Sequence, residues 1–339
     1  MSLRAGAGQL VMVGVPADSD GLSAAETEAL RTGVGNLILT GRSARGVDFT
    51  ARLVHRLRIV MRRGPAGLVR PEVAADQEGG QVQVLSGAGF ADMPTAQVQG
   101  TWSVRHVRRA ADRWGRQLHR AGVTLNLSPV LDVVPSGRAN EPIGRYDRGF
   151  ANTPRRVKRT GTAFVRGHGR AGTAVSIKHF PGLGRATGNT DVTADVIDRL
   201  TGRHDRFLRP FQAVIHQGGA AYVMMSSARY TRLDASRPAA FSPLIVRGML
   251  RRQLRFDGVV ISDDLGNAVA VQHMPPGRRA VAFIRAGGDM ALSVDAASAT
   301  AMVDALIRRA RTHRHFHAKL DRAVLRVLRR KADAGLVCR

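Results

Sequence analysis

Short apolar stretches alternate along the chain with longer stretches in which apolar residues recur every three or four positions. The short stretches are rich in Val, Ile, Leu and Ala, which is typical of buried β-strands. The eight strands that we predict lie at residues 10–15, 35–40, 69–75, 123–133, 174–177, 221–226, 258–262 and 289–293. The longer stretches have the spacing of amphipathic helices. They lie near residues 47–61, 104–120, 155–170, 207–217, 243–254, 278–286, 297–311 and 316–334, and Ser23 with Glu26 fits a capping box that opens one more helix.

Strands that alternate with helices predict a parallel sheet with helical crossovers. Eight repeats of this kind favour a closed (β/α)8 barrel of the TIM type over an open, doubly wound sheet. No Gly-x-Gly-x-x-Gly follows the first strand, so a dinucleotide-binding fold has little support. We find no linker and no break in composition, and we therefore predict a single α/β domain that spans residues 1–339.

The charge of the chain is its most unusual property. It has 52 basic and 26 acidic residues, which gives a net charge of +26, and almost all of the basic residues are arginine. Such a field favours polyanions. However, the arginines are spread from Arg4 to Arg339, and aromatic residues, on which bases could stack, make up only 5%. We expect weak binding to polyanions and no specific nucleic-acid partner.

Several classes of protein have no support in the sequence. The only cysteine, Cys338, excludes a disulfide framework, and the histidines do not pair with other donors at ligand spacing, so we expect neither metal nor organic cofactor. No apolar run approaches the roughly 18 to 20 residues of a membrane span. The first ten residues lack the features of a signal peptide. The chain as it stands is thus expected in the cytoplasm, with export left open if a leader once preceded it, and we expect a monomer.

The most prominent polar residues follow predicted strands, at the end of the barrel where barrel enzymes build their active sites. They are Asp76, Glu78, Asp132, Lys178, His179, Asp263 and Asp264, and Arg148 lies in the long loop 140–150. Carboxylates interleaved with cations, without metal spacing, suit a neutral polyhydroxy ligand such as a sugar. Two carboxylates that face each other across the sugar would make a glycosidase.

Four segments resemble the motifs of glycoside hydrolase family 3, and in particular its single-domain β-N-acetylhexosaminidases. Residues 178–184 are similar to the family signature Lys-His-Phe-Pro-Gly-x-Gly, and residues 76–80 to Asp-x-Glu-Gly-Gly. Residues 258–265 resemble the strand Gly-Val-Val-x-Ser-Asp-Asp-Leu, and residues 142–150 a loop that contains Pro, Ile-Gly and Arg-x-Phe. The motifs occur in the order of the family and cover most of the chain from Gln9 to Leu292.

The resemblance implies a role for each motif residue. Asp263 would be the nucleophile that forms a covalent glycosyl-enzyme, whereas the side chain of Asp264 would point to the other face of the strand. The sugar would be held by Asp76, Arg148, Lys178 and His179. Lys178 would also keep the Asp263 carboxylate ionised.

The chain departs from the family at two places. Where many members have Asp-Ser-His, with the histidine as acid/base, this chain has Asn189-Thr190-Asp191. Asp191 is therefore our candidate acid/base, because an aspartate can also protonate a leaving group; the alternative is a loop aspartate that caps a turn. Val84 replaces a family arginine that contacts the sugar, which predicts weaker affinity or altered specificity.

The expected function is a retaining exo-β-N-acetylglucosaminidase that removes terminal GlcNAc from oligosaccharides or muropeptides derived from the cell wall, or from chitin. One alternative is a family member that acts on another β-sugar, such as a β-glucosidase. Another is a catalytically impaired protein that binds sugar or polyanions. Whether water or phosphate accepts the sugar in the second step stays open.

Overall fold

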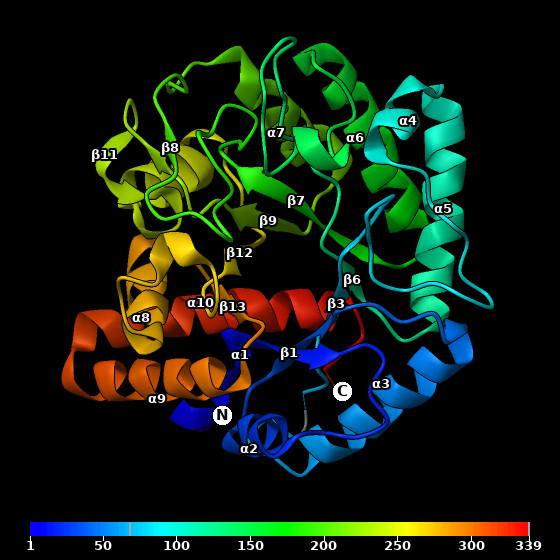
Figure 1. Cartoon of the computed structure of the whole chain (residues 1–339). Helices are drawn as coiled ribbons and strands as arrows, with labels where there is room; N and C mark the ends of the chain where they lie inside the picture. Colours follow the sequence, from blue (N-terminus) through cyan, green and yellow to red (C-terminus); the bar gives the residue numbers. More distant parts are fainter. Residues whose placement is uncertain (68, 338–339) are drawn as a thin grey trace.

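Parallel strands close into a barrel in the computed structural model, which describes residues 1–67 and 69–337 (Figure 1). The barrel order is β1-β13-β12-β9-β7-β6-β3-β2, and β1 closes it by pairing with both β2 and β13. The strands are β1 (Val11–Pro16), β2 (Asn36–Thr40), β3 (Val73–Ala75), β6 (Leu125–Asn126), β7 (Ala174–Phe180), β9 (Tyr222–Met225), β12 (Val259–Asp264) and β13 (Met290–Ser293). Each overlaps one of the eight predicted strands, so the prediction of a (β/α)8 barrel is confirmed.

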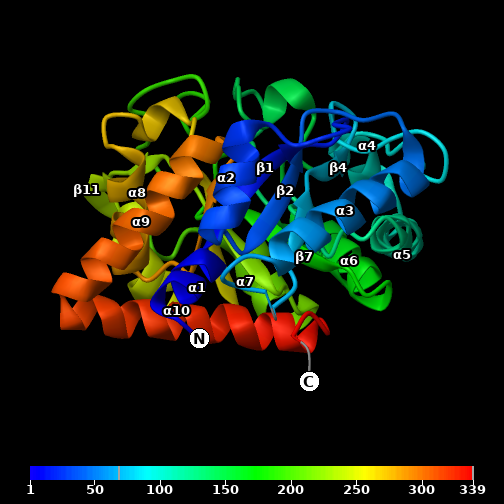
Figure 2. The same cartoon turned by 90° about the horizontal axis from the view of Figure 1, so that it is seen from below.

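Helices surround the barrel, and most of them lie where the apolar spacing predicts them (Figures 1 and 2). The α-helices are α1 (Leu3–Gln9), α2 (Ala24–Thr32), α3 (Gly46–Arg62), α4 (Ala96–Thr101), α5 (Val104–Arg120), α6 (Pro154–Arg170), α7 (Arg209–Ala213), α8 (Pro276–Ala286), α9 (Ala296–Thr312) and α10 (Arg314–Asp333). Two segments, η3 (Val214–Gly218) and η5 (Leu244–Gln253), are π-helical. The predicted capping box is present, because Ser23 Oγ accepts from Glu26 N and the Glu26 carboxylate accepts from Ser23 N.

The loops at the C-terminal ends of the strands carry two small sheets that were not predicted. One joins β8 (Ile197–Asp198), β10 (Arg229–Tyr230) and β11 (Asp234–Pro238), and the other is a hairpin of β4 (Gln77–Gly79) and β5 (Val82–Gln83). The hairpin turns at Gly79 and Gly80, which both have positive φ. A Cβ atom on Gly79 would lie 2.2 Å from the carbonyl oxygen of Pro94, so only glycine fits there. The hairpin fixes the segment that carries Asp76 and Glu78.

Helix α10 lies across the N-terminal end of the barrel, opposite the small sheets (Figure 2). Its apolar face, which includes Phe316, Leu320 and Val327, is buried. This amphipathic helix therefore packs with its apolar face against the helices and the strand β12 above it. Across the described residues, no helix combines the length and the apolar character that crossing a membrane would need. Cys338 lies outside the described residues.

A lysine of α10 is fully buried at this closed end. Lys331 Nζ donates to the side-chain oxygen of Gln9 at 2.6 Å and to the carbonyl of Gly35 at 2.9 Å. Burial lowers the pKa of Lys331 from 10.5 to about 7, although the charge of buried Glu72 acts in the opposite direction. The charged form of this side chain is therefore destabilised in the folded protein.

This shift predicts a pH-dependent stability. Between about pH 7 and pH 10.5 the unfolded chain holds a proton on Lys331 that the folded protein has lost, so stability should rise with pH. The wild type should gain up to about 1.4 kcal/mol per pH unit relative to Lys331→Met, which lacks the group. Urea unfolding of both proteins at pH 7, 8.5 and 9.5 measures this difference. If the free energies of unfolding of the two proteins changed with pH in parallel, Lys331 would have its normal pKa in the folded protein.

Candidate active site

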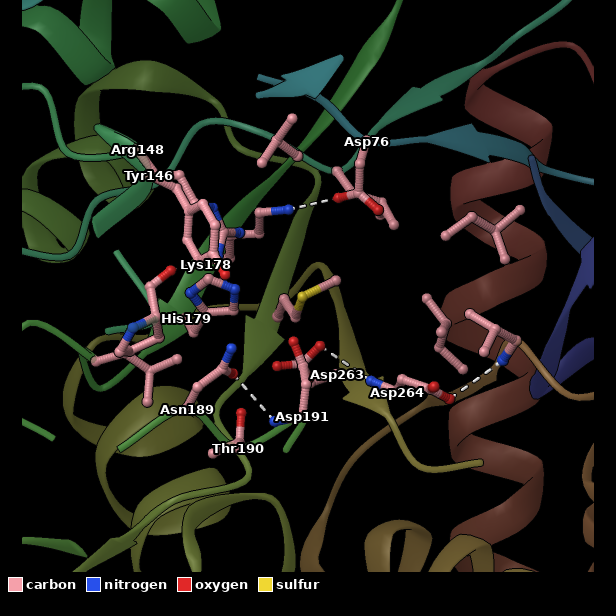
Figure 3. A pocket seen from close by; sticks show the side chains of 18 of the residues that line it. Asp76, Tyr146, Arg148, Lys178, His179, Asn189, Thr190, Asp191, Asp263 and Asp264 are labelled. Carbon is pink, nitrogen blue, oxygen red and sulfur yellow. Dashed lines mark hydrogen bonds and ion pairs between the residues drawn. The ribbon is translucent and has the colours of Figure 1, made fainter. Parts of the chain in front are cut away.

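A cavity of about 450 Å³ opens at the C-terminal ends of the barrel strands (Figure 3). The structure brings together in its lining all of the residues to which we assign a role from the sequence. These are Asp76, Arg148, Lys178, His179, Asp191 and Asp263. They come from distant parts of the chain, and the parallel order of the barrel gathers them at one end.

Lys178 is the centre of a buried charge network at one side of the cavity. Its Nζ atom lies 2.5 Å from Asp76 Oδ1 and 2.7 Å from Glu78 Oε1. Arg148 binds Glu78 through two nitrogens, Nε at 2.8 Å and Nη2 at 2.7 Å. Burial acts to raise the pKa of Glu78, but the charges of Arg148 and Lys178 lower it to about 2. Glu78 thus stays ionised and fixes the positions of both cations.

His179, the residue after Lys178 on β7, is held by a buried carboxylate. Asp132 Oδ2 lies 2.7 Å from the Nδ1 atom of His179, and Asp132 Oδ1 accepts from the backbone N–H groups of His179 and Leu183 at 3.1 and 2.9 Å. Asp132 is fully buried and does not line the cavity. With Nδ1 bound to Asp132, the imidazole ring has a fixed orientation at the cavity wall, as Figure 3 shows.

The two adjacent aspartates at the end of β12 have different surroundings. Asp263 accepts one hydrogen bond, from the backbone N–H of Asp264 at 3.0 Å, and its carboxylate faces the cavity (Figure 3). The carboxylate of Asp264 accepts from the backbone N–H groups of Gly266, Asn267 and Val294 at 2.8 to 3.2 Å. Asp264 therefore stabilises the turn after the strand. The Asp263 carboxylate can still accept hydrogen bonds from a ligand. The two aspartates differ in this way because successive side chains of a strand point to opposite faces.

The pKa of Asp263 is raised to about 6. Burial is the main cause; the charges of His179 and Lys178 lower the pKa, and the charge of Asp191 raises it. We expected Lys178 to keep Asp263 ionised, and its charge acts in that direction, but the desolvation of the carboxylate outweighs it. At neutral pH Asp263 is still mostly ionised. The influence of Asp191 shows that the two carboxylates interact across the cavity.

Asp191 lies in an exposed loop that is attached to the segment after β12. The carbonyl oxygens of Thr190 and Asp191 accept from Ala270 N at 3.1 Å and Val269 N at 3.3 Å. Asn189 Oδ1 accepts from Asp191 N, so the side chain that caps this turn is Asn189. Within residues 1–67 and 69–337, nothing donates a hydrogen bond to the Asp191 carboxylate. The alternative in which Asp191 caps a turn therefore has no support, and the carboxylate is available at the cavity.

Some residues of the site were missed in the sequence or were given no role. Glu78 and Asp132 stood out by their places after strands, but their roles as partners of cations and of His179 depend on tertiary contacts. Arg42 also lines the cavity, and its Nη2 donates to the carbonyl of Gln81 at 2.6 Å. It lies two residues after the end of β2, so the rule that found the other residues could have found it. Val84 packs against the hydrophobic core and does not line the cavity.

No group of three or more His, Cys, Asp or Glu side chains that could hold a metal ion occurs in the described part of the chain. The cavity instead combines buried cations, whose charges are matched by carboxylates, with two further carboxylates that flank an open space. This arrangement, at the C-terminal mouth of a (β/α)8 barrel, defines a glycosidase-type site.

The comparison with known families agrees with this class. The model of the glycosyl hydrolase family 3 N-terminal domain matches residues 2–330, and the chain belongs to this family. The resemblance found in the four motifs is thereby confirmed, and the chain is a glycoside hydrolase.

Three similar proteins are described as β-hexosaminidases or β-N-acetylhexosaminidases. The crystal structure of a β-N-acetylhexosaminidase from Beutenbergia cavernae DSM 12333 has a TM-score of 0.94 and 43% sequence identity, and the match covers 98% of this chain and 99% of that one. A β-hexosaminidase of Methylococcus capsulatus is 36% identical over 290 residues, which are 83% of this chain and 82% of the relative. The β-hexosaminidase LpqI of Mycobacterium tuberculosis is 33% identical over 331 residues, 94% of this chain and 80% of the relative.

Proposed function

We propose that this chain is a retaining exo-β-N-acetylglucosaminidase that releases terminal β-linked GlcNAc from oligosaccharides derived from the cell wall or from chitin. The names of its relatives support the choice of sugar. The observation that carries the mechanism is that Asp263 and Asp191 line one cavity, beside the buried pair Lys178 and His179; the charge of Asp191 also raises the pKa of Asp263. Two carboxylates of this kind are what a retaining glycosidase requires.

In the first step an oxygen of the ionised Asp263 carboxylate attacks the anomeric carbon. The bond from that carbon to the leaving oxygen breaks, and the protonated Asp191 carboxyl gives its proton to the leaving oxygen. The product is a glycosyl ester on Asp263, of inverted configuration. Asp191 suits the acid role because its carboxylate has no donor from the described residues and can reach a group bound in the cavity.

In the second step Asp191, now ionised, takes a proton from a water molecule. The oxygen of that water attacks the anomeric carbon, and the ester bond to Asp263 breaks. The sugar leaves with its β configuration, and Asp191 is protonated again for the next cycle. The exposure of the loop that carries Asp191 gives water access to this side of the cavity.

The remaining residues bind the sugar in this proposal. Asp76 and His179 offer hydrogen-bonding groups to its hydroxyls, and Lys178 and Arg148 supply charged donors. Because Glu78 and Asp132 hold these side chains in place, little rotamer entropy is lost when the sugar binds. A site with fixed donors and acceptors discriminates among sugars by the hydroxyls that it leaves unpaired.

The raised pKa of Asp263 predicts how kcat/KM depends on pH on the acid side of the profile. Because only ionised Asp263 can attack, kcat/KM should fall as the pH drops below about 6. The charge of Asp191 raises this pKa, so Asp191→Asn should move the acid limb to lower pH. Both profiles can be measured with a dinitrophenyl glycoside, whose leaving group needs no acid. An acid limb that stays in place in the variant would contradict the coupling.

The proposed sugar is tested by turnover of para-nitrophenyl N-acetyl-β-glucosaminide beside the corresponding glucoside. We expect a clear preference in kcat/KM for the N-acetyl substrate. A preference for the glucoside would replace our proposal by a β-glucosidase of the same family. If neither substrate is turned over while sugar binding is retained, the chain is a catalytically impaired sugar-binding protein. The reason to test this alternative is the Asn189-Thr190-Asp191 triplet, which departs from the family motif.

A further inference from the structure

Helices α5 and α6 pack side by side on one flank of the barrel (Figures 1 and 2), and together they carry a dense group of exposed cations. We call this surface the α5–α6 face. Its exposed cations are Arg105, Arg108, Arg109, Arg113, Arg116, Arg120, Arg155, Lys158, Arg159, Arg166 and Arg170. The two helices contain a single acidic residue, Asp112, and it is paired with Arg116. The face therefore carries far more positive charge than its own side chains can compensate.

Close helix packing makes the face continuous. A Cβ atom on Gly167 of α6 would lie 2.5 Å from Ala111 Cβ and 2.6 Å from the carbonyl oxygen of Arg108 on α5. Gly115 of α5 is similarly close to Ala171, just after the end of α6. Because these glycines let the two backbones approach, the arginines of the two helices lie close to one another on one flank of the barrel.

The N-terminal half of α5 forms a hollow of about 340 Å³ on this face. It is lined by Ser103, Arg105, His106, Arg109, Ala110 and Arg113. The three arginines are four residues apart, which places them about 6 Å apart along the helix axis. No guanidinium group among the three forms a hydrogen bond or an ion pair with any residue that the structure describes. Their guanidinium donors are thus free to bind repeated anionic groups.

We propose that the α5–α6 face binds a linear acidic polysaccharide, with Arg105, Arg109 and Arg113 as its main contacts. A regular row of guanidinium groups matches a polymer that carries one anionic group in each repeat. Nucleic acid fits less well, because Trp114 and Phe164 are buried, and the ring of His106 at the hollow already packs on Trp102, with 4.3 Å between the ring centroids, which leaves little aromatic surface for bases to stack on. A carbohydrate polymer also agrees with the family of the chain.

The position of the hollow connects it with the active site. Ser103, which lines the hollow, follows α4 closely, and Gln97 N of α4 donates at 3.1 Å to the carbonyl oxygen of Asp147, in the loop whose Arg148 lines the active-site cavity. Arg156 of α6 donates to the carbonyl oxygens of Gly100 and Trp102, which ties this end of α6 to the segment just before α5. A polymer bound in the hollow would therefore hold the enzyme against a glycan while the cavity stays open.

The test compares two triple variants that lose the same charge from different surfaces. The first is Arg105→Gln with Arg109→Gln and Arg113→Gln. The control is Arg308→Gln with Arg311→Gln and Arg322→Gln, exposed arginines of α9 and α10. Binding of fluorescent heparin, a sulfated linear polysaccharide, is measured over a series of salt concentrations, beside single- and double-stranded DNA of matched charge. Circular dichroism and turnover of the nitrophenyl substrate report on folding.

We expect the α5 variant to bind heparin roughly tenfold more weakly than the wild type and with a shallower salt dependence, because three ionic contacts are lost. The control should lose no more than about twofold, and all three proteins should turn over the small substrate equally. Equal losses in the two variants would show that net charge alone drives binding, which overturns the proposal. Tighter binding of DNA than of heparin by the wild type would identify a nucleic-acid face instead. Since binding is measured without turnover, a failure of the proposed hydrolysis would not affect the result.

Discussion

Replacement of Asp263 by alanine should lower kcat/KM for the N-acetyl-β-glucosaminide by about 10⁴-fold or more, the range found when a covalent nucleophile is removed from other enzymes. The reason is that Asp263 alone, of the aspartate pair at the end of β12, presents free acceptor capacity to the cavity. Azide should restore part of the activity by entering the space of the lost carboxylate. The product should then be the α-glycosyl azide, because azide attacks from the face that Asp263 occupied.

Asp264→Asn is the matched control for this variant. Asp264 uses its carboxylate to accept three backbone hydrogen bonds, so its replacement should weaken the turn and lower thermal stability. Turnover per folded molecule should remain close to that of the wild type. If Asp264→Asn abolished turnover and Asp263→Ala retained it, the nucleophile would be the other aspartate.

Replacement of Asp191 by alanine should lower kcat by about 10²- to 10⁴-fold for substrates with a poor leaving group, which need protonation of the leaving oxygen. The loss should be much smaller for a dinitrophenyl leaving group, because this group departs without a proton. Azide should accelerate the breakdown of the glycosyl-enzyme and give the β-glycosyl azide. The dependence of kcat/KM on leaving-group pKa is the measurement that shows this difference.

Thr190→Ala is a suitable control, since it changes the same loop and leaves the Asp191 carboxylate in place. The backbone bonds of Thr190 and Asp191 to the segment 269–270 do not depend on the threonine side chain. Unchanged activity in Asp191→Ala with every leaving group would remove Asp191 from the mechanism. The loop would then have only a structural role, and another group would have to supply the proton.

Much of the fold could be predicted because the barrel strands are buried on both faces. A strand of this kind reads as a continuous apolar run, and the runs at 10–15 and 221–226 have no competing helical spacing. The helices could be predicted because each has one apolar face. The start of α5 in particular follows from Ser103, which caps its first turn.

The elements that were missed lack these signals. Helix α1 is short and consists largely of alanine and glycine, and its position depends on packing against α10. The hairpin β4–β5 and the sheet of β8, β10 and β11 contain short, polar strands, whose pairing is set by the loops that they join. Nothing in the local apolar spacing of the sequence distinguishes the π-helical η5 from an α-helix.

The sequence could predict which residues form the site, but not the contacts among them. Polar residues directly after buried strands must meet at one end of a barrel, and this reasoning together with the family resemblance identified Lys178, His179 and Asp263. It could not show that Glu78 binds both Lys178 and Arg148, because those contacts join segments far apart in the sequence. Nor could it show that burial, more than neighbouring charge, determines the pKa of Asp263.

The most direct test of the proposed mechanism is covalent labelling of the nucleophile. The protein is incubated with a 5-fluoro derivative of N-acetylglucosaminyl fluoride, which forms the glycosyl ester readily and hydrolyses slowly, and is then digested for peptide mass spectrometry. We predict one added sugar per chain, on the peptide of β12 and at Asp263, and no label in Asp263→Ala. A label on another carboxylate, or turnover of the nitrophenyl substrate without any trapped ester, would contradict the assignment of Asp263 as the nucleophile of a retaining glycosidase.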